Sequence, residues 1–149
     1  DGARVTGSAV VAKCGFWRNT GSGLAISGFP GTSAHVSRTT ADGNSGDGIS
    51  LLGSDGGDVV ECSANSNGGT GLVVAASPIP GGAAATGVRV DQCFASSNSV
   101  GISVSGQNFV VRCGGSHNTL TNMSLDPLVF AGPSASSPAW IEVKPYAWP

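Results

Sequence analysis

The sequence predicts an all-β solenoid in which about five short rungs stack on one another, followed by a C-terminal tail that does not repeat. Three observations support this fold class. A turn sequence that begins with asparagine recurs along the chain, valine and cysteine stand at fixed distances before that asparagine, and a short alternating apolar strand follows each turn. Internal repeats of 20 to 50 residues are typical of stacked architectures.

Five asparagines mark equivalent places in the repeat, and successive ones are 25, 23, 31 and 20 residues apart. They are Asn19, Asn44, Asn67, Asn98 and Asn118. Five residues before each stands a small residue, namely Cys14, Thr39, Cys62, Cys93 and Cys113. Three residues earlier stands valine each time, namely Val11, Val36, Val59, Val90 and Val110. The shared register of these columns predicts one structural unit per copy.

A short strand is expected after the turn glycines Gly23, Gly48, Gly71 and Gly101. The segments read LAI, ISL, LVV and ISV, and the last copy has MSL at 123–125. Their alternation places every second side chain on one face. No segment has a helical period, and most copies are too short for a strand–helix–strand unit. The segment ASPIPGGAAATG lengthens one copy and is predicted to loop out of its rung.

The pattern V-x-x-C-x-x-x-x-N-x-G-x-G-[IL] resembles the right-handed parallel β-helix repeats of the pectate-lyase-like superfamily, over roughly residues 4–126. This resemblance implies a right-handed parallel β-helix over 1–126 and a separate tail over 127–149. It implies no particular activity, because that superfamily includes lyases, hydrolases, viral tail and fibre proteins, and modules without a known reaction. No catalytic or calcium-binding set of the superfamily matches this chain residue by residue.

Stacking predicts a role for each repeated residue type. Equivalent residues of parallel rungs lie above one another at a spacing of about 4.8 Å, so that columns become ladders. A buried asparagine can bond both the turn and the next rung. We expect glycine to supply the left-handed backbone of the turn. We expect the four cysteines to be free thiols, because stacked side chains point in parallel and no CxxC or CxxH pair suggests zinc.

The composition argues against nucleic acid and membranes as binding partners. Only 11% of the residues are charged, the net charge is −2, and no basic cluster is present, which argues against nucleic acid. No apolar run reaches the roughly 20 residues that span a bilayer. The chain opens with DGARV and no signal segment, so we interpret it as a processed or excised piece of a longer protein. We expect no cofactor and no membrane partner.

The charged residues indicate a candidate site on one sheet. The columns place His35, Asp58 and Arg89 in one stripe, with Arg38, Glu61 and Asp91 close by. One interpretation is a polysaccharide-binding site, in which a base or a carboxylate pair could also cleave the polymer. The other is a solvated ladder whose opposite charges contribute a few tenths of a kcal/mol per pair.

Aspartates in the glycine-rich turns raise the question of calcium. Asp42, Asp47, Asp55 and Asp58 have a composition that sometimes holds this ion. The regular nonapeptide of calcium-binding solenoids and the spacing of an EF-hand are both missing, and turn chemistry explains aspartate here. We therefore predict no metal site.

The tail has a different composition, with five prolines and four of the nine aromatic residues. An open solenoid end needs a cover. The tail could cap its own stack, or three copies could meet through Phe130, Trp140, Tyr146 and Trp148. The sequence thus favours a non-catalytic surface or fibre module, outside the cell or on a virion, that binds glycans and trimerises. The alternatives are a carbohydrate-active enzyme or its remnant, and a piece that only shapes a larger assembly.

Overall fold

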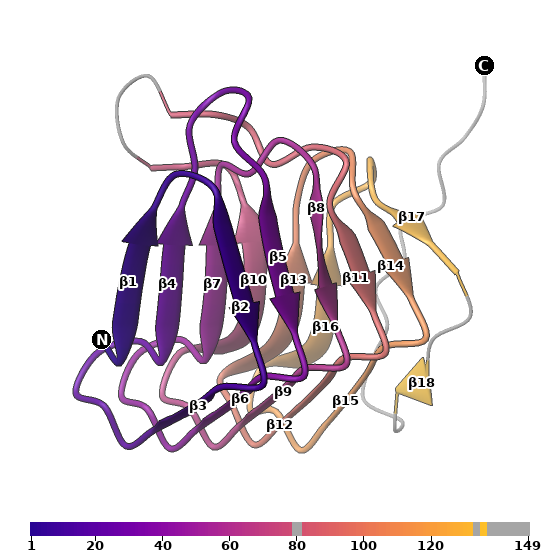
Figure 1. Cartoon of the computed structure of the whole chain (residues 1–149). Coiled ribbons are helices and arrows are strands. Elements are labelled where there is room, and N and C mark those ends of the chain that lie inside the picture. Colours follow the sequence, from indigo (N-terminus) through magenta and orange to yellow (C-terminus); the bar gives the residue numbers. More distant parts are fainter. Residues whose placement is uncertain (79–81, 133–134, 137–149) are drawn as a thin grey trace.

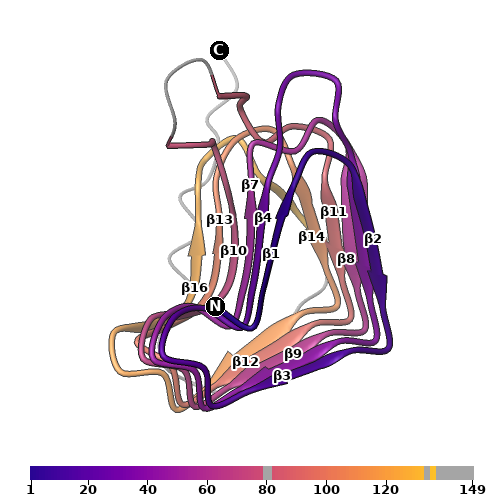
Figure 2. The same ribbon diagram turned by 60° about the vertical axis from the view of Figure 1, so that its left-hand side comes forward.

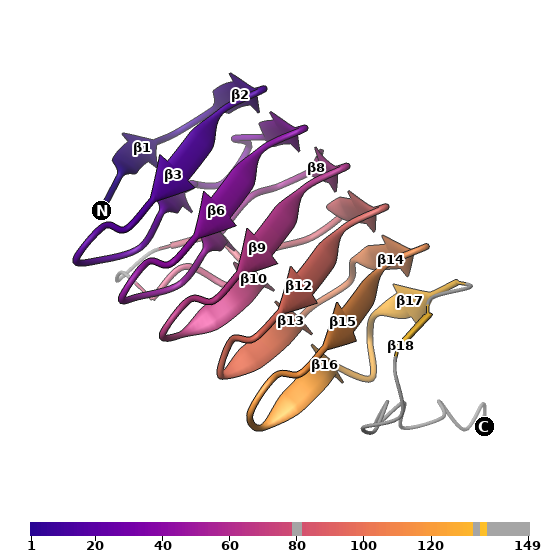
Figure 3. The same ribbon diagram turned by 90° about the horizontal axis from the view of Figure 1, so that it is seen from below.

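A computed structural model describes residues 1–78, 82–132 and 135–136, and its regular structure consists of β-strands alone. The strands form three parallel sheets that wrap around one core, as Figures 1 and 2 show. Each rung contributes one strand to each sheet, so that five rungs follow one another along the stack and a sixth set of strands, two of them only two residues long, ends it (Figure 3). The predicted all-β solenoid of about five rungs is confirmed.

Each sheet contains six strands in sequence order along the stack. Sheet A consists of β1 (Ala3–Thr6), β4 (Leu24–Ser27), β7 (Ile49–Leu52), β10 (Thr70–Ala75), β13 (Val100–Val104) and β16 (Thr121–Leu125). Sheet B consists of β2 (Ala9–Ala12), β5 (Ala34–Ser37), β8 (Gly57–Val60), β11 (Arg89–Asp91), β14 (Phe109–Val111) and β17 (Phe130–Ala131). Sheet C consists of β3 (Gly15–Trp17), β6 (Thr40–Asp42), β9 (Ser63–Asn65), β12 (Phe94–Ser96), β15 (Gly114–Ser116) and β18 (Ala135–Ser136).

The core is built from the predicted columns. Leu24 pairs with Ile49, and that column continues through the later strands of sheet A. The valine column of sheet B also faces inward, where Val36, Val59 and Val90 are fully buried. Successive side chains of a strand point to opposite faces, so sheet A adds a second inward column two residues along, which includes Ile26, Leu51 and Val74. No single rung could bury these groups, and stacking buries them jointly.

The asparagine column forms a continuous ladder at the corner between sheets C and A. The Nδ2 atoms of Asn44 and Asn67 donate to the Oδ1 atoms of Asn67 and Asn98 at 2.9 and 3.0 Å. The same Oδ1 atoms accept the backbone N–H groups of Asn44 and Asn67 at 3.0 and 2.9 Å. The second N–H of Asn67 Nδ2 reaches the Ala41 carbonyl at 3.2 Å. Each interior amide thereby satisfies its polar atoms within the stack.

Asn122 ends the ladder in place of a sixth repeat asparagine. Its Oδ1 accepts the Asn118 Nδ2 at 2.9 Å and the Asn118 backbone N–H at 3.3 Å. Residues 122–124 read Asn-Met-Ser, which is the acceptor pattern for N-glycosylation. The Asn122 side chain is only 1% exposed, so the folded protein does not present it to a glycosyltransferase.

The turn glycines are required for space rather than for a left-handed backbone, which corrects the expectation from the sequence. Gly23, Gly48, Gly71 and Gly101 do not have positive φ angles. A Cβ at Gly48 would lie 2.5 Å from the Gly71 carbonyl oxygen and 2.8 Å from the Asn67 Nδ2. Glycine at this place lets the next rung and the asparagine ladder come close.

Left-handed residues stand at other places, with glycines such as Gly7, Gly53 and Gly106 between sheets A and B and non-glycine residues between sheets B and C. At the corner between sheets B and C, one residue per rung has a φ angle between 48° and 56°. These residues are Lys13, Arg38, Glu61, Gln92 and Arg112. Most of them are charged, which brings much of the small charge content of the chain to one edge of sheet B.

All four cysteines are free thiols, as predicted. Cys62, Cys93 and Cys113 are buried and Cys14 is exposed. The Cys93 Sγ contacts the carbonyl oxygens of Val59 and Asp91, both at 3.3 Å. Hydrogen bonds with the Cys113 and Cys62 thiols, together with burial, raise the pKa of Cys93. The middle of the thiol column is therefore unreactive structural packing.

Beyond Asp126 the chain adds two short strands to the stack. β17 pairs with β14, and β18 pairs with β15. The start of the predicted tail thus extends sheets B and C. The division at residue 126 stays a prediction, and Trp140, Tyr146 and Trp148 lie outside the described residues.

Candidate binding face on sheet B

The outer face of sheet B carries two columns of side chains, and we call the more exposed one the ridge. The strand register stacks its members directly on one another. In order along the stack they are Val10, His35, Asp58, Arg89, Phe109 and Phe130. The structure therefore brings His35, Asp58 and Arg89 together in the predicted order. The ridge is apolar at both ends and charged in its middle.

The first polar pair of the ridge is His35 with Asp58. The His35 Nδ1 lies 3.3 Å from the Asp58 Oδ1, and both side chains are open to solvent. An imidazole oriented by a carboxylate is a combination that serves binding as well as acid–base chemistry.

Asp91 lies beneath the surface between two arginines. Arg112 donates from its Nε to the Asp91 Oδ1 at 2.9 Å and from its Nη2 to the Oδ2 at 2.5 Å. Arg89 also donates to the Oδ2 of Asp91. Asp91 is 1% exposed, whereas the two guanidinium groups are about half exposed at 54% and 56%. Asp91 is thus placed to orient two cations, and its grouping with the binding residues stays a prediction.

The Asp91 cluster has clear electrostatic consequences. The hydrogen bonds from Arg112, aided by the charges of Arg112 and Arg89, lower the pKa of Asp91. The hydrogen bond to Asp91 and the negative charge of Asp91 in turn raise the pKa of Arg112. Two cations share one carboxylate, so the cluster of Arg89, Arg112 and Asp91 has a net positive charge. Donors of both guanidinium groups remain directed at solvent, because each has five N–H groups.

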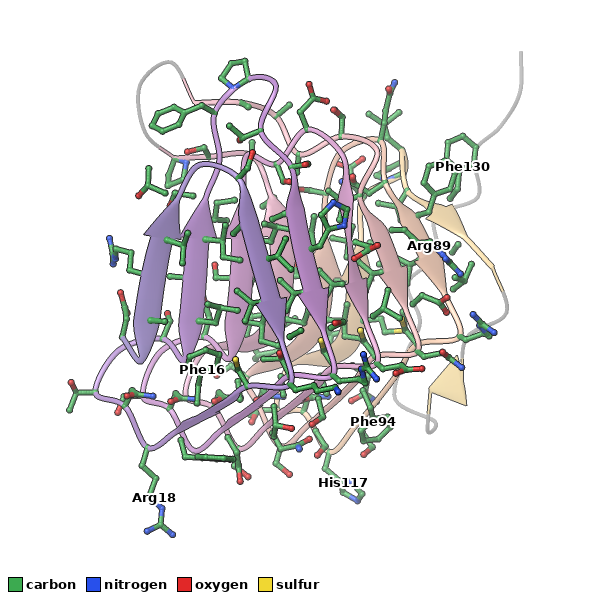
Figure 4. The ribbon with its side chains drawn as sticks, viewed as in Figure 1. Phe16, Arg18, Arg89, Phe94, His117 and Phe130 are labelled. Carbon is green, nitrogen blue, oxygen red and sulfur yellow. The ribbon has the colours of Figure 1, made fainter. Side chains whose placement is uncertain are left out.

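Beside this cluster lies an exposed aromatic pair. The rings of Phe109 and Phe130 stack with centroids 5.4 Å apart and an interplanar angle of 20°. Their residues are 47% and 63% exposed. Arg89 precedes Phe109 in the ridge, and Figure 4 shows Arg89 and Phe130 on the same side of the stack. An apolar platform is therefore adjacent to fixed hydrogen-bond donors.

Arg38 and Glu61 occupy the corner of sheet B at successive rungs. Among the described residues, the structure records no ion pair between them. Both residues lie beside the ridge, and no ion pair of the described residues joins either of them to a ridge residue. Of the residues at this corner, Arg112 pairs with Asp91 across a rung, whereas within the described part of the chain no pair joins Arg38 to Glu61.

Sequence reasoning did not identify Phe109, Phe130 and Arg112 as one site. Phe109 stands in the same repeat column as Arg89, and Arg112 in the same column as Glu61. The position of each residue in its repeat column was the sequence signal that could have placed it beside the predicted site. Phe130 lies beyond the last repeat, so no column could place its ring against Phe109.

The turn aspartates have structural partners. The Asp47 Oδ1 accepts the Thr70 backbone N–H at 2.8 Å, and the Asp55 Oδ1 accepts the Thr86 hydroxyl at 3.0 Å. Within residues 1–78, 82–132 and 135–136, no group of three or more His, Cys, Asp or Glu side chains could hold a metal ion. No helix in that part of the chain is long and apolar enough to cross a membrane.

Comparison with known proteins identifies the repeat. A family model described as "right handed beta helix region" matches residues 2–80, which is just over half of the 149-residue chain. The chain belongs to this right-handed β-helix family. No curated protein and no solved structure matched the chain in the two other comparisons. Membership in the family fixes the handedness of the β-helix but not its activity, so the function depends on the residues of the ridge.

Proposed function

We propose that this right-handed β-helix is a non-catalytic module that binds a polysaccharide along the ridge of sheet B. The observation that carries the proposal is the stacked pair of Phe109 and Phe130 next to Arg89 and Arg112, which are both held by the buried Asp91. Apolar faces of sugar rings pack well on aromatic side chains, and their hydroxyl groups accept hydrogen bonds from guanidinium groups.

Preorganisation supports binding at this face. Arg112 is fixed by two hydrogen bonds to Asp91, and Arg89 by another. Side chains that are already ordered lose less entropy when a ligand arrives. The parallel strands beneath the ridge are joined in one continuous sheet and repeat at about 4.8 Å, so that a linear polymer could contact several rungs in succession.

A display role outside the cell or on a virion is consistent with this proposal, as is assembly into trimers through the tail. Phe130, an exposed aromatic residue, is the member of the proposed trimer contact that lies in the described part of the chain. Light scattering at concentrations above the micromolar range tests assembly. A trimeric mass is expected, and a monomeric mass would remove trimerisation while leaving the binding proposal intact.

The pair of His35 and Asp58 favours one second candidate, a carbohydrate-active enzyme or its remnant. A histidine at 3.3 Å from a carboxylate has the arrangement of a base with its orienting partner. Incubation with uronate polymers would then produce ultraviolet absorbance from a new double bond, and the rise would be lost in His35→Ala. Absorbance that stays flat over hours with folded protein contradicts a lyase, and the absence of new reducing ends in the same incubation contradicts a hydrolase.

The test of the main proposal is a glycan array followed by titration of each positive ligand. We expect binding without turnover, with a loss of about tenfold in affinity for Arg89→Ala. Lys13→Ala is the matched control, since Lys13 is a cation on the same sheet edge but at the opposite end of the stack. Absence of binding by the folded protein across the array contradicts the proposal.

A further inference from the structure

The N-terminal end of the stack presents one half of a rung-to-rung interface. β1, β2 and β3 are the end strands of sheets A, B and C, and each has a neighbour on one side only. Figure 3 shows the three strands side by side at this end of the molecule. Unpaired strand edges are templates for further pairing.

Asn19 shows the same incompleteness in the ladder. Its backbone N–H and its Nδ2 donate to the Asn44 Oδ1 at 3.0 and 2.8 Å, as in every other rung. Each interior Oδ1 accepts two such bonds from the preceding rung, whereas no described residue donates to the Oδ1 of Asn19. A half-buried acceptor of this kind is costly to leave without a donor.

The first rung is also an incomplete core layer. Val5 and Val11 are half-buried, whereas their partners in the second rung, Ile26 and Val36, are 1% and 0% exposed. Cys14 is exposed, although Cys62 of the same column is buried. Phe16, labelled in Figure 4, begins a column that continues through alanine in the next three rungs, and its ring packs against the core at this end.

We propose that this end is the docking surface for one more rung of the same repeat, formed by the segment of the polypeptide that directly precedes Asp1. A rung of this kind meets all the requirements together: three parallel strand edges in one layer, an amide donor above Asn19, and apolar side chains above Val5 and Val11. The contact repeats the interface that already joins the first rung to the second.

A second copy of the chain does not meet these requirements. Two N-terminal ends facing each other would pair their strands antiparallel, whereas all the pairs in this stack are parallel. Stacking on the C-terminal end of another copy would pair β2 and β3 with β17 and β18, which are only two residues long against the four residues of β2 and the three of β3, so that layer would stay incompletely paired.

The register makes the proposal specific. Ala3 pairs with Leu24, and the Asp1 Oδ1 accepts the Ser22 backbone N–H at 2.9 Å, so Asp1 stands at the place of Ser22 in the next rung. Asn19 precedes Ser22 by three residues. We therefore expect the third residue before Asp1 to be asparagine or another amide donor, preceded by a strand with an inward apolar residue.

The experiment compares the 149-residue chain with the natural gene product extended by the residues that precede Asp1. An extension of about 25 residues corresponds to the length of one rung. The first readout is the reaction rate of the Cys14 thiol with a thiol reagent, and the second is the thermal midpoint. Covering the end should slow the reaction of Cys14 by about tenfold or more, because burial makes it depend on local opening. The midpoint should rise by several degrees.

Two controls separate a docked rung from a loose extension. A scrambled extension of the same composition should leave both readouts unchanged. Replacing the amide residue expected at the third position before Asp1 by leucine should remove part of the rise in the thermal midpoint. The proposal is overturned if Cys14 of the extended, folded protein reacts as fast as before, if the scrambled extension protects it equally, or if no coding residues precede Asp1.

Discussion

The Nδ2 of Asn67 donates to the Oδ1 of Asn98 at 3.0 Å, across a sequence separation of 31 residues. The separation includes the insertion of residues 76–87, yet the ladder keeps its register. Loops outside the stack therefore change length without disturbing the columns that define it.

Replacing Asn67 by alanine should destabilise the protein by about 3 kcal/mol or more, because buried partners in two neighbouring rungs lose their hydrogen bonds. The backbone N–H and the Nδ2 of Asn44 would lose an acceptor, and the Ala41 carbonyl would lose a donor. Asn19→Ala at the open end should cost about 1 kcal/mol. Urea unfolding of both variants measures the difference, and equal losses would show that the interior ladder has no special weight.

Replacing Gly48 by alanine should be among the most damaging single substitutions in the chain. The new Cβ would lie 2.5 Å from the Gly71 carbonyl oxygen and 2.9 Å from the Ala64 Cβ, and backbone cannot move aside cheaply. Gly31→Ala is the control, because its surroundings are open and only its φ angle of +76° is unfavourable. We expect about 1 kcal/mol for the control and several times more for Gly48→Ala. Thermal midpoints that fall by the same amount would contradict the steric role.

Stability should fall in acid through Asp91. The hydrogen bonds from Arg112 lower its pKa in the folded state, so the unfolded chain binds the proton more tightly. The stabilisation is therefore complete above the unfolded pKa of about 3.9 and is lost as the pH falls below it through the folded value. Asp91→Asn should be less stable at pH 7 and should show a smaller decrease between pH 5 and pH 2.

The control for that series is Asp42→Asn, since Asp42 has no ion pair among the described residues. It should keep the acid dependence of the parent protein. Urea unfolding at each pH gives the comparison. An Asp91→Asn profile parallel to that of the parent would mean that another carboxylate controls the acid response.

The repeat columns predicted the fold because each rung must bury the same side chains in the same way. Val36 and Val59 are inward in the structure because their column has an apolar residue in every copy. The same logic placed His35 above Asp58. Periodicity fixes which residues share a column, and a column in a parallel stack is a set of neighbours.

Features that depend on how side chains reach across columns were not predictable in this way. Arg112 bends from the corner to the buried Asp91 of the preceding rung, a contact between two different columns. The role of Gly48 was assigned to its backbone angle, whereas the distance to the next rung decides it. Phe130 lies past the final repeat, and only the pairing of β17 with β14 brings it to Phe109.

The most direct test of the binding face compares two phenylalanines with equal exposure on different sheets. Phe109 on sheet B and Phe94 on sheet C are each 47% exposed, so truncating either removes a similar apolar surface. Titration with a glycan identified on the array should show that Phe109→Ala weakens binding about tenfold, while Phe94→Ala leaves it unchanged. Equal affinities for the two variants, or a loss only in Phe94→Ala, would contradict binding at the ridge of sheet B.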